Sequence, residues 1–295
     1  MYEDSSGTLG ESGSLAGSLK SDPRLIYLIL VLVITVPLLT HSSVAVPISS
    51  TTLTLYQFIQ HLPPNSLVVE SFDYATSVVP ELHPQAIVVT QQLFLRPLKT
   101  LFVAQDTNGP PLAEAVLDTV NKGNKTYGVD YADLGYIPNT ATLIGMAANI
   151  AAFLPLDTHG NPTASLPIIK EYPAIKRASL VITFDDDSSA ANSYIQYWEG
   201  SYKIPVAIGA TATIAPGFMP FYSSGQLVGV LFSVRAADEY EELLYQQYHC
   251  CVGISGASSA MVALSTSQLL IVAMVMVANA AYFIGKRTSQ RNRST

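Results

Sequence analysis

Carboxylate side chains follow three stretches of this sequence that have the composition of buried β-strands. Glu70 and Asp73 close the first stretch, Asp106 follows the second, and Asp185, Asp186 and Asp187 follow the third. In an open parallel sheet, the ligand crevice lies beyond the carboxyl ends of the strands. Carboxylate oxygens in such a crevice suit a divalent cation. The pattern therefore predicts a ligand or cation site made by Asp73, Asp106 and Asp185–Asp187, and no other cofactor is predicted.

Helix capping is the competing interpretation of the same acidic residues. A carboxylate ahead of a helix accepts hydrogen bonds from free backbone N–H groups and interacts favourably with the helix dipole. The run Asp185–Asp187 directly precedes a stretch with helical spacing that begins at Ser188. Asp185 and Asp187 also match the short Asp-x-Asp pattern with which metal-dependent sugar transferases hold a nucleotide diphosphate. Capping, cation binding and metal-dependent transfer stay open, in that order of preference.

The other polar side chains do not predict a catalytic residue. The five histidines are scattered, and none belongs to a His-Glu-x-x-His motif. The sequence has no Gly-x-Ser-x-Gly nucleophile turn. The loop 106–111 precedes a helix, but it lacks the glycine spacing and the lysine of a phosphate-binding loop. Helix capping is therefore the preferred role of this loop as well.

One sequon marks a candidate modification site. Asn124-Lys125-Thr126 lies in a polar stretch, and its pattern makes Asn124 a candidate N-glycosylation acceptor. A second triplet of this kind, Asn292-Arg293-Ser294, lies in the basic C-terminal tail, on the side of the membrane that is predicted to be cytoplasmic.

The only two cysteines of the chain, Cys250 and Cys251, are adjacent. The peptide bond between neighbours fits disulfide geometry badly, and two thiols are too few for a structural zinc site. The sequence predicts free thiols on a stalk or, in an oxidising compartment, an intermolecular disulfide between two chains.

The segment 49–263 is strongly acidic, with 18 acidic and 9 basic side chains and a net charge of −9. Phosphate binding depends on Lys and Arg, so this composition argues against a nucleic-acid partner. Two aromatic clusters suit a protein interface, although core packing under a loop is the simpler interpretation. Their members are Tyr127, Tyr131 and Tyr136 in one cluster and Phe218, Phe221 and Tyr222 in the other.

Short β-rich stretches alternate with longer stretches of helical spacing between residues 67 and 245. Strands are predicted at 67–70, 100–104, 179–184 and 204–208. Helices are predicted at 84–95, from the 106–111 loop through 120, and at 141–153, 188–199 and 235–245. Strands that alternate with helices of this length form a parallel sheet covered on both faces. The predicted fold class is α/β, with a doubly wound, mainly parallel sheet.

Two apolar segments bracket this domain and are predicted to be transmembrane helices. A membrane helix needs about 20 apolar residues; the first segment, 25–48, reaches this length only when residues beyond Thr40 are included, and the second is 264–285. The Lys and Arg residues that lie near the ends of the spans stand before the first span and after the second. By the positive-inside rule, the sequence predicts a two-pass cell-membrane protein with cytoplasmic termini and an extracytoplasmic central domain. A cleaved signal peptide is the alternative for the first segment, because residues 43–45 are small.

The predicted organisation has six segments. They are a disordered cytoplasmic tail at 1–24, a transmembrane helix at 25–48, an extracytoplasmic α/β domain at 49–252, a linker at 253–263, a transmembrane helix at 264–285 and a basic cytoplasmic tail at 286–295. Ala278, Ala281 and Gly285 share one face of the second span, and small residues let helices approach closely. We therefore expect a homo-oligomer or a complex with another membrane protein. The spans lack the charges of an ion pathway, so a channel or pump is not expected.

Three ordered blocks resemble sequences of a group of uncharacterised prokaryotic membrane-anchored proteins. The blocks are Tyr127-Gly128-Val129-Asp130-Tyr131 with Leu134-Gly135-Tyr136 and Pro138, then Ala215-Pro216 through Pro220 with Ser224-Gly225-Gln226-Leu227-Val228-Gly229, and finally Ala237-Asp238-Glu239-Tyr240-Glu241-Glu242-Leu243. The likeness covers about residues 67–285, and Asn139 stands where the group has a glycine. The resemblance implies a membrane-anchored α/β architecture and brings no activity with it.

A non-enzymatic function is the first expectation for this chain. It is a membrane-anchored scaffold or assembly protein that presents an extracytoplasmic partner-binding domain. The alternative is an extracytoplasmic sensor or binding domain for a small ligand or a cation at the carboxyl edge of the sheet. A metal-dependent transferase is third. Because α/β sheets host many functions, the site has to decide among them.

Overall fold

The computed structural model describes residues 23–40 and 47–291 of the chain. The predicted N-terminal tail up to residue 22 and the last four residues lie outside the described part. By its internal contacts the chain divides into two compact units, which are described separately. The larger is Ser43–Met261, and the smaller combines Met1–Ser42 with Val262–Thr295.

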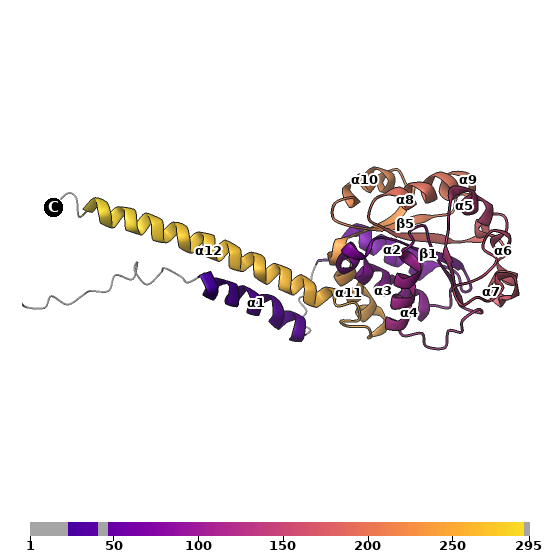
Figure 1. Ribbon diagram of the computed structural model, residues 1–295, viewed down its shortest axis with the longest axis horizontal. Helices are drawn as coiled ribbons and strands as arrows, with labels where there is room; N and C mark the ends of the chain where they lie inside the picture. The colour runs from indigo at the N-terminus through magenta and orange to yellow at the C-terminus, as the bar shows by residue number, and fades with distance from the viewer. Residues whose placement is uncertain (1–22, 41–46, 292–295) are drawn as a thin grey trace, which may run out of the picture. The chain divides into compact units, whose positions relative to one another are not determined.

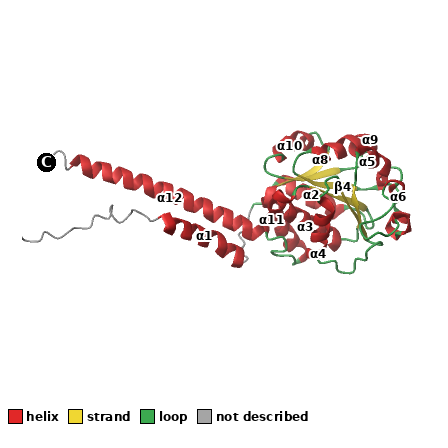
Figure 2. Ribbon diagram, in the orientation of Figure 1, coloured by secondary structure: helices red, strands yellow, loops and turns green. Residues whose placement is uncertain are grey.

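A six-stranded, all-parallel sheet forms the centre of the larger unit, and helices cover both of its faces (Figures 1 and 2). The strands are β1 Leu67–Asp73, β2 Lys99–Ala104, β3 Tyr131–Tyr136, β4 Leu180–Asp185, β5 Val206–Ala210 and β6 Leu227–Phe232. Their spatial order, β3-β2-β1-β4-β5-β6, is that of a doubly wound dinucleotide-binding sheet. The winding reverses between β1 and β4. The predicted α/β class with a parallel sheet is confirmed.

The helices of the larger unit form two layers. One face of the sheet carries α2 Ser50–His61, α3 Val79–Leu95, α4 Gly109–Thr119 and α11 Ser233–Tyr248. The other face carries α5 Thr140–Met146, α6 Ile150–Phe153, α7 Pro167–Glu171, α8 Ser189–Tyr194 and α10 Ala215–Ser223. A single turn, α9 Gly200–Tyr202, follows a π-helical segment at Ile195–Glu199.

Alternate residues of each strand supply the two cores. In β1, Val68 and Phe72 belong to the core under α3, whereas Leu67 and Val69 belong to the core under α8. Because both faces are covered, β1, β4 and β5 are buried along their whole length, and their few polar residues are buried as well.

Several elements differ from their predicted bounds. β1 continues to Asp73, so Glu70 lies in the middle of the strand and not at its end. The helix predicted at 141–153 is divided into α5 and α6. Asn149 causes this break, because its Oδ1 accepts the Ala152 N–H at 3.2 Å and starts a new helix.

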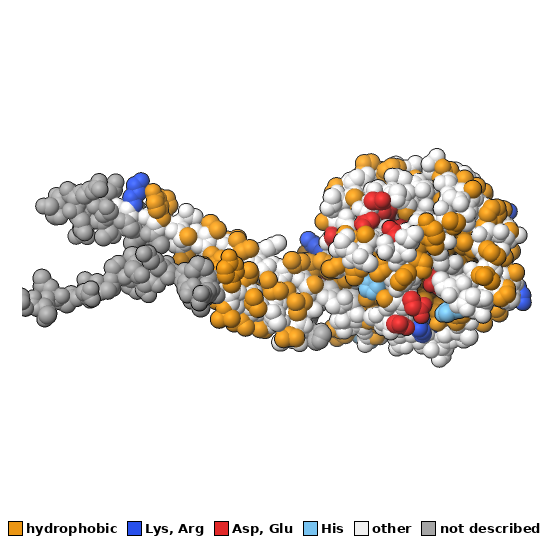
Figure 3. All heavy atoms as spheres, in the orientation of Figure 1, with side chains coloured by type: hydrophobic (Ala, Val, Ile, Leu, Met, Phe, Trp, Pro, Cys, Tyr) orange, Lys and Arg blue, Asp and Glu red, His pale blue; other side chains and the backbone are white. Residues whose placement is uncertain are grey.

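The smaller unit contains α1 Pro23–Thr40 and most of α12 Ala257–Arg291. The segment Ala257–Ala280 of α12 is long and apolar enough to cross a membrane. In α1 the apolar helix Ile26–Thr40 is shorter than a span, and residues 41–46 of the predicted first span lie outside the described part. Figure 3 shows hydrophobic side chains covering the described parts of both helices. Since α12 begins at Ala257, the second half of the predicted linker is helical.

Candidate functional site

The carboxyl ends of β1 and β4 lie side by side where the winding of the sheet reverses, and each strand ends in an aspartate. Asp73 and Asp185 are paired in the register of the two strands. Both side chains are buried, with 5% and 0% of the residue exposed. This is the position where doubly wound sheets bind ligands.

The carboxylate of Asp73 is held by its neighbours in the sheet. Its Oδ1 accepts the Gln105 N–H at 2.5 Å, and its Oδ2 accepts the Thr183 hydroxyl at 2.7 Å. Burial raises the pKa of Asp73 to about 6, although these hydrogen bonds oppose the rise.

The carboxylate of Asp185 organises the turn that leads into α8. Its Oδ1 accepts the N–H groups of Asp187 and Ser188, both at 3.0 Å, and its Oδ2 accepts the Ala191 N–H at 2.8 Å. Burial raises the pKa of Asp185 to about 7, and the negative charge of Asp73 adds to the rise.

The remaining predicted acids also bind backbone groups. Asp186 Oδ2 accepts the Ala75 N–H at 3.1 Å, so it links the turn after β4 to the turn after β1. Asp187 Oδ1 accepts the Ser189 N–H at 2.8 Å, and Asp106 Oδ1 accepts the Asn108 N–H at 2.7 Å. These bonds to turns and helix starts are the contacts that the capping interpretation predicts.

The structure brings only part of the predicted cation site together. One oxygen from each of Asp185, Asp186 and Asp187 lies within 4.8 Å of the others, a spacing that one cation can bridge. Among the described residues, Asp73 and Asp106 do not belong to this group. Cation binding at Asp185–Asp187 therefore stays a prediction, with the backbone N–H groups as competitors for the same oxygens.

Helix α4 packs closely on the ends of β1 and β2, on one side of the switch point. A Cβ on Gly109, the first residue of α4, would be 2.1 Å from the Phe72 carbonyl oxygen and 2.2 Å from the Ala104 Cβ. The turn after β1 has no glycine, and one of its N–H groups is already bound to Asp186. A pyrophosphate needs such N–H groups free and would meet carboxylates instead. The switch point thus lacks the features of a nucleotide site.

Sequence reasoning misses the polar residues that surround the two aspartates. The Ser71 and Tyr194 hydroxyls lie 2.7 Å apart, and both residues are completely buried beside Asp73. Burial raises the pKa of Tyr194 far above its ordinary value. The sequence gives one sign of this polar cluster: Ser71 and Thr183 are hydroxyl residues within otherwise largely apolar strands.

A groove of about 650 Å³ runs along the sheet edge formed by β6. Its lining residues come from α2, from the end of α10 and from β6, and none of them carries a carboxylate, a lysine or an arginine. They are Thr54, Gln57, Phe58, His61, Leu62, Tyr222, Gly225, Leu227 and Val228. At one end, Thr54 Oγ1 and Tyr222 Oη lie 3.1 Å apart and bridge α2 and α10. No pattern in the sequence predicts this groove, because it joins segments about 170 residues apart.

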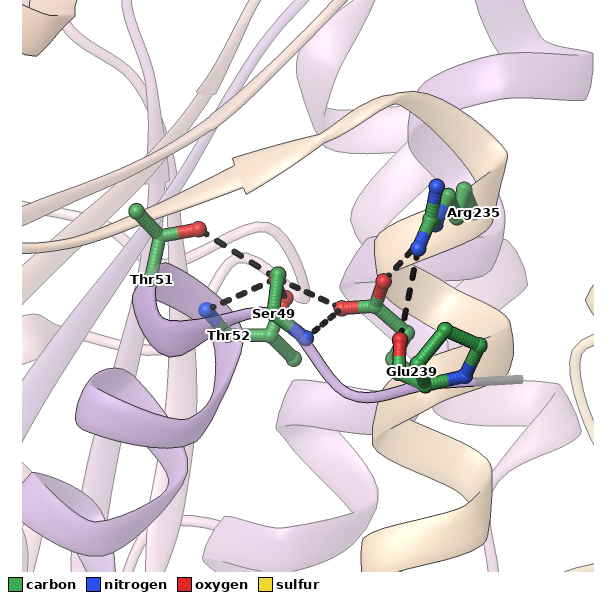
Figure 4. A network of polar contacts seen from close by, with 6 residues as sticks. Ser49, Thr51, Thr52, Arg235 and Glu239 are labelled. Atoms are coloured by element: carbon green, nitrogen blue, oxygen red, sulfur yellow. Dashed lines mark hydrogen bonds and ion pairs between the residues drawn. The ribbon is translucent and has the colours of Figure 1, made fainter.

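The buried carboxylate of Glu239, paired with the half-exposed Arg235, fixes the start of α2 against α11 (Figure 4). Glu239 Oε2 accepts the Ser49 N–H at 3.0 Å and the Ser49 hydroxyl at 2.6 Å, while Glu239 Oε1 accepts Arg235 Nε at 2.9 Å. A cavity of about 350 Å³ adjoins these residues. Since Glu239 already occupies the position of an anion at this helix start, the cavity does not form an anion site.

Some residues of the two predicted aromatic clusters belong to the hydrophobic core, and others are exposed. Tyr131 packs its ring 5.1 Å from that of Phe94, and Phe218 is also buried. Tyr136 is exposed. Core packing is therefore the role of Tyr131 and Phe218, as the simpler interpretation predicts.

The cysteines and the sequon lie apart from the switch point. Cys250 and Cys251 are joined to each other by a disulfide, whereas the sequence predicts free thiols or a bond between two chains. Asn124 is exposed in the turn between α4 and β3.

These features define the larger unit as a doubly wound α/β domain in which β1 and β4 end in buried, hydrogen-bonded carboxylates at the switch point. Comparisons with protein-family models, with curated proteins and with solved structures find no match for this chain.

Proposed function

We propose that this chain is a membrane-anchored scaffold or assembly protein that displays its α/β domain outside the cytoplasm and binds a protein partner with it. The apolar segment Ala257–Ala280 supports a membrane anchor. The Lys and Arg residues that follow this segment support cytoplasmic placement of the C-terminus, and so an external domain.

The groove beside β6 is the observation that carries the partner-binding role. The segment 49–263 has a net charge of −9, yet no acidic residue lines this groove. Its half-buried floor is apolar, with Phe58 and Val228, and its rim carries the neutral polar side chains of Thr54 and Gln57. An apolar centre with a polar rim and few charges is the composition of a protein interface. A groove next to the edge strand of a sheet also suits an extended or helical segment of another protein.

Site-specific photo-cross-linking in the native membrane tests this proposal. A photo-reactive benzoylphenylalanine replaces Gln57, which is exposed in the groove, in the full-length chain. The matched control places the same residue at Asn192, which is exposed on α8 across the sheet. We expect a protein adduct of defined mass from position 57 and none from position 192.

Blocking the groove gives the second arm of this test. Thr54→Arg and Val228→Arg place a long charged side chain at one end and on the floor of the groove. Both should remove the adduct while the melting temperature of the Thr54→Arg variant stays near that of the parent, since Thr54 is exposed. Equal adducts at positions 57 and 192, or an adduct that survives both substitutions, would reject the groove as the binding surface.

A cation sensor is the second candidate, and the spacing of Asp185, Asp186 and Asp187 favours it. Calorimetry with Ca²⁺, Mg²⁺ or Mn²⁺ on the purified chain tests it, with Asp186→Asn as the variant that removes one ligand. Metal at about 100 times its dissociation constant would stabilise the fold by roughly 2.7 kcal/mol. Absence of both binding heat and a melting shift at millimolar metal leaves only the capping role. No further observation on the described residues favours the metal-dependent transferase.

A further inference from the structure

The turn between α4 and β3 carries an asparagine whose side chain the fold does not use. The Lys125 N–H donates to the Lys122 carbonyl at 2.9 Å, and Gly123 has a φ of +53°. Asn121 Oδ1 accepts the Gly123 N–H at 3.0 Å and holds the turn from one side. Asn124 lies in the exposed part of this turn.

Other loop asparagines have structural roles that Asn124 lacks. Asn139 and Asn149 cap helices through their side-chain oxygens, and Asn161 Nδ2 donates to Asp157 at 3.0 Å. Within the described ranges 23–40 and 47–291, the Asn124 carboxamide has no hydrogen-bond partner. A bulky group on its nitrogen would therefore break no bond of the folded domain.

We propose that Asn124 carries an N-linked glycan. The triplet Asn124-Lys125-Thr126 is the acceptor pattern, and Thr126 is exposed like Asn124. In the transfer, Asn124 Nδ2 forms a bond to the anomeric carbon of a lipid-linked oligosaccharide. The bond from that carbon to the lipid phosphate oxygen breaks, the phosphate leaves with the bonding electron pair, and the nitrogen gives up one proton. This proposal rests on the proposed display of the domain outside the cytoplasm.

The position of Asn124 relative to the sheet suits a glycan. Asn124 precedes β3, the strand at one edge of the sheet, whereas the groove lies beside β6 at the other edge. An edge strand presents unpaired backbone groups that invite association with other chains. A glycan before β3 would shield this edge and leave the groove open to a partner.

Mass spectrometry of the protein from its own membranes tests the proposal. A protease that cuts before aspartate releases the peptide 118–129, which contains both Asn121 and Asn124. We expect the peptide to carry an added oligosaccharide mass, and fragmentation should place it on Asn124. Asn124→Gln and Thr126→Ala should abolish the added mass, and the conservative Thr126→Ser should retain it.

A membrane-impermeant amine reagent on the same intact cells separates this proposal from the display of the domain. Labelling of Lys203, whose side chain is 75% exposed, shows whether the domain lies outside the membrane barrier. A labelled Lys203 with an unmodified Asn124 overturns the glycan and leaves the display standing. An unlabelled Lys203 with an unmodified Asn124 overturns both, as does a glycan found on Asn292 and not on Asn124.

Discussion

Buried carboxyl groups without cations are the main chemical feature at the scale of single residues. Eight carboxyl side chains are buried in the described part of the chain, and Glu239 is the one among them that forms an ion pair. Burial raises the pKa of Glu70 to about 8, and burial also raises the pKa values of Asp73, Asp133 and Asp185. The folded domain therefore binds protons that the unfolded chain releases. Its free energy of unfolding should fall as the pH rises from about 4 toward 8.

Glu70 should contribute the largest part of this pH dependence. Its Oε2 accepts the Thr90 hydroxyl at 2.9 Å, while its Oε1 is buried without a hydrogen-bond partner among the described residues. Each unit of pKa shift corresponds to about 1.4 kcal/mol. Glu70→Gln is neutral at every pH, so it should match the parent near pH 5 and exceed it in stability by a few kcal/mol at pH 8.

Denaturant unfolding in detergent, followed by the fluorescence of the single tryptophan, Trp198, measures this difference. The exposed Glu171→Gln is the matched control, and it should keep the pH slope of the parent. A parent protein that becomes more stable between pH 5 and pH 8 would contradict the account of Glu70.

At the scale of elements, α4 approaches the sheet very closely at the ends of β1 and β2. A Cβ on Gly109 would overlap backbone and Cβ atoms of two strands, which cannot move independently. Gly109→Ala should therefore destabilise the domain by about 3 kcal/mol. Gly217→Ala, in α10, is the control, because nothing lies within 4 Å of its Cβ position. Similar melting temperatures for both variants would show that α4 does not pack on β1 and β2 in this way.

The end of α11 should hold the segment that leads into α12. Glu241, which is buried, accepts the N–H groups of Gly253 at 3.0 Å and Ser255 at 2.8 Å. Glu241→Gln removes the charge that strengthens these bonds, at a cost of about 1.5 kcal/mol or more. Amide hydrogen exchange at Gly253 and Ser255 should accelerate roughly 10-fold. The neighbouring Glu242→Gln should leave both rates unchanged, and equal effects of the two substitutions would refute the role of Glu241.

The sequence predicts the elements whose local pattern is strong and misses those that depend on tertiary contacts. β1, β2, β4 and β5 are apolar runs that end in turn residues, so period and composition reveal them. β3 contains a buried aspartate, Asp133, and α2 is rich in threonine, a weak helix former. Their burial comes from packing partners far away in the chain.

The candidate site also combines features that the local sequence predicts with features that depend on tertiary contacts. The proximity of Asp185, Asp186 and Asp187 follows from their adjacency in the chain, and their role in capping follows from the helix after them. The pairing of Asp73 with Asp185 depends on strand order and register, which no local pattern states. Gly109 lets α4 approach β1 and β2 through a tertiary contact, so its importance becomes visible only in the folded domain.

At the scale of the whole molecule, an acidic domain and an apolar C-terminal helix make up one chain. The small residue Ala278 and the predicted helical face around it favour association of such helices. We expect the full-length protein to run as a homo-oligomer in mild detergent. Ala278→Leu should shift it toward the monomer, while the control Val277→Leu should not. A monomeric mass for the parent protein over a wide concentration range would rule out self-association through this face.

The location of the α/β domain is the central claim. Its most direct test is a specific protease site inserted between Lys122 and Gly123, in the exposed turn before β3, in a chain that also carries a C-terminal tag. In intact spheroplasts, the account predicts that added protease cuts the chain at this turn while the tag remains inaccessible to its antibody until detergent opens the membrane. A chain that is cut only after detergent is added would contradict the extracytoplasmic display of this domain.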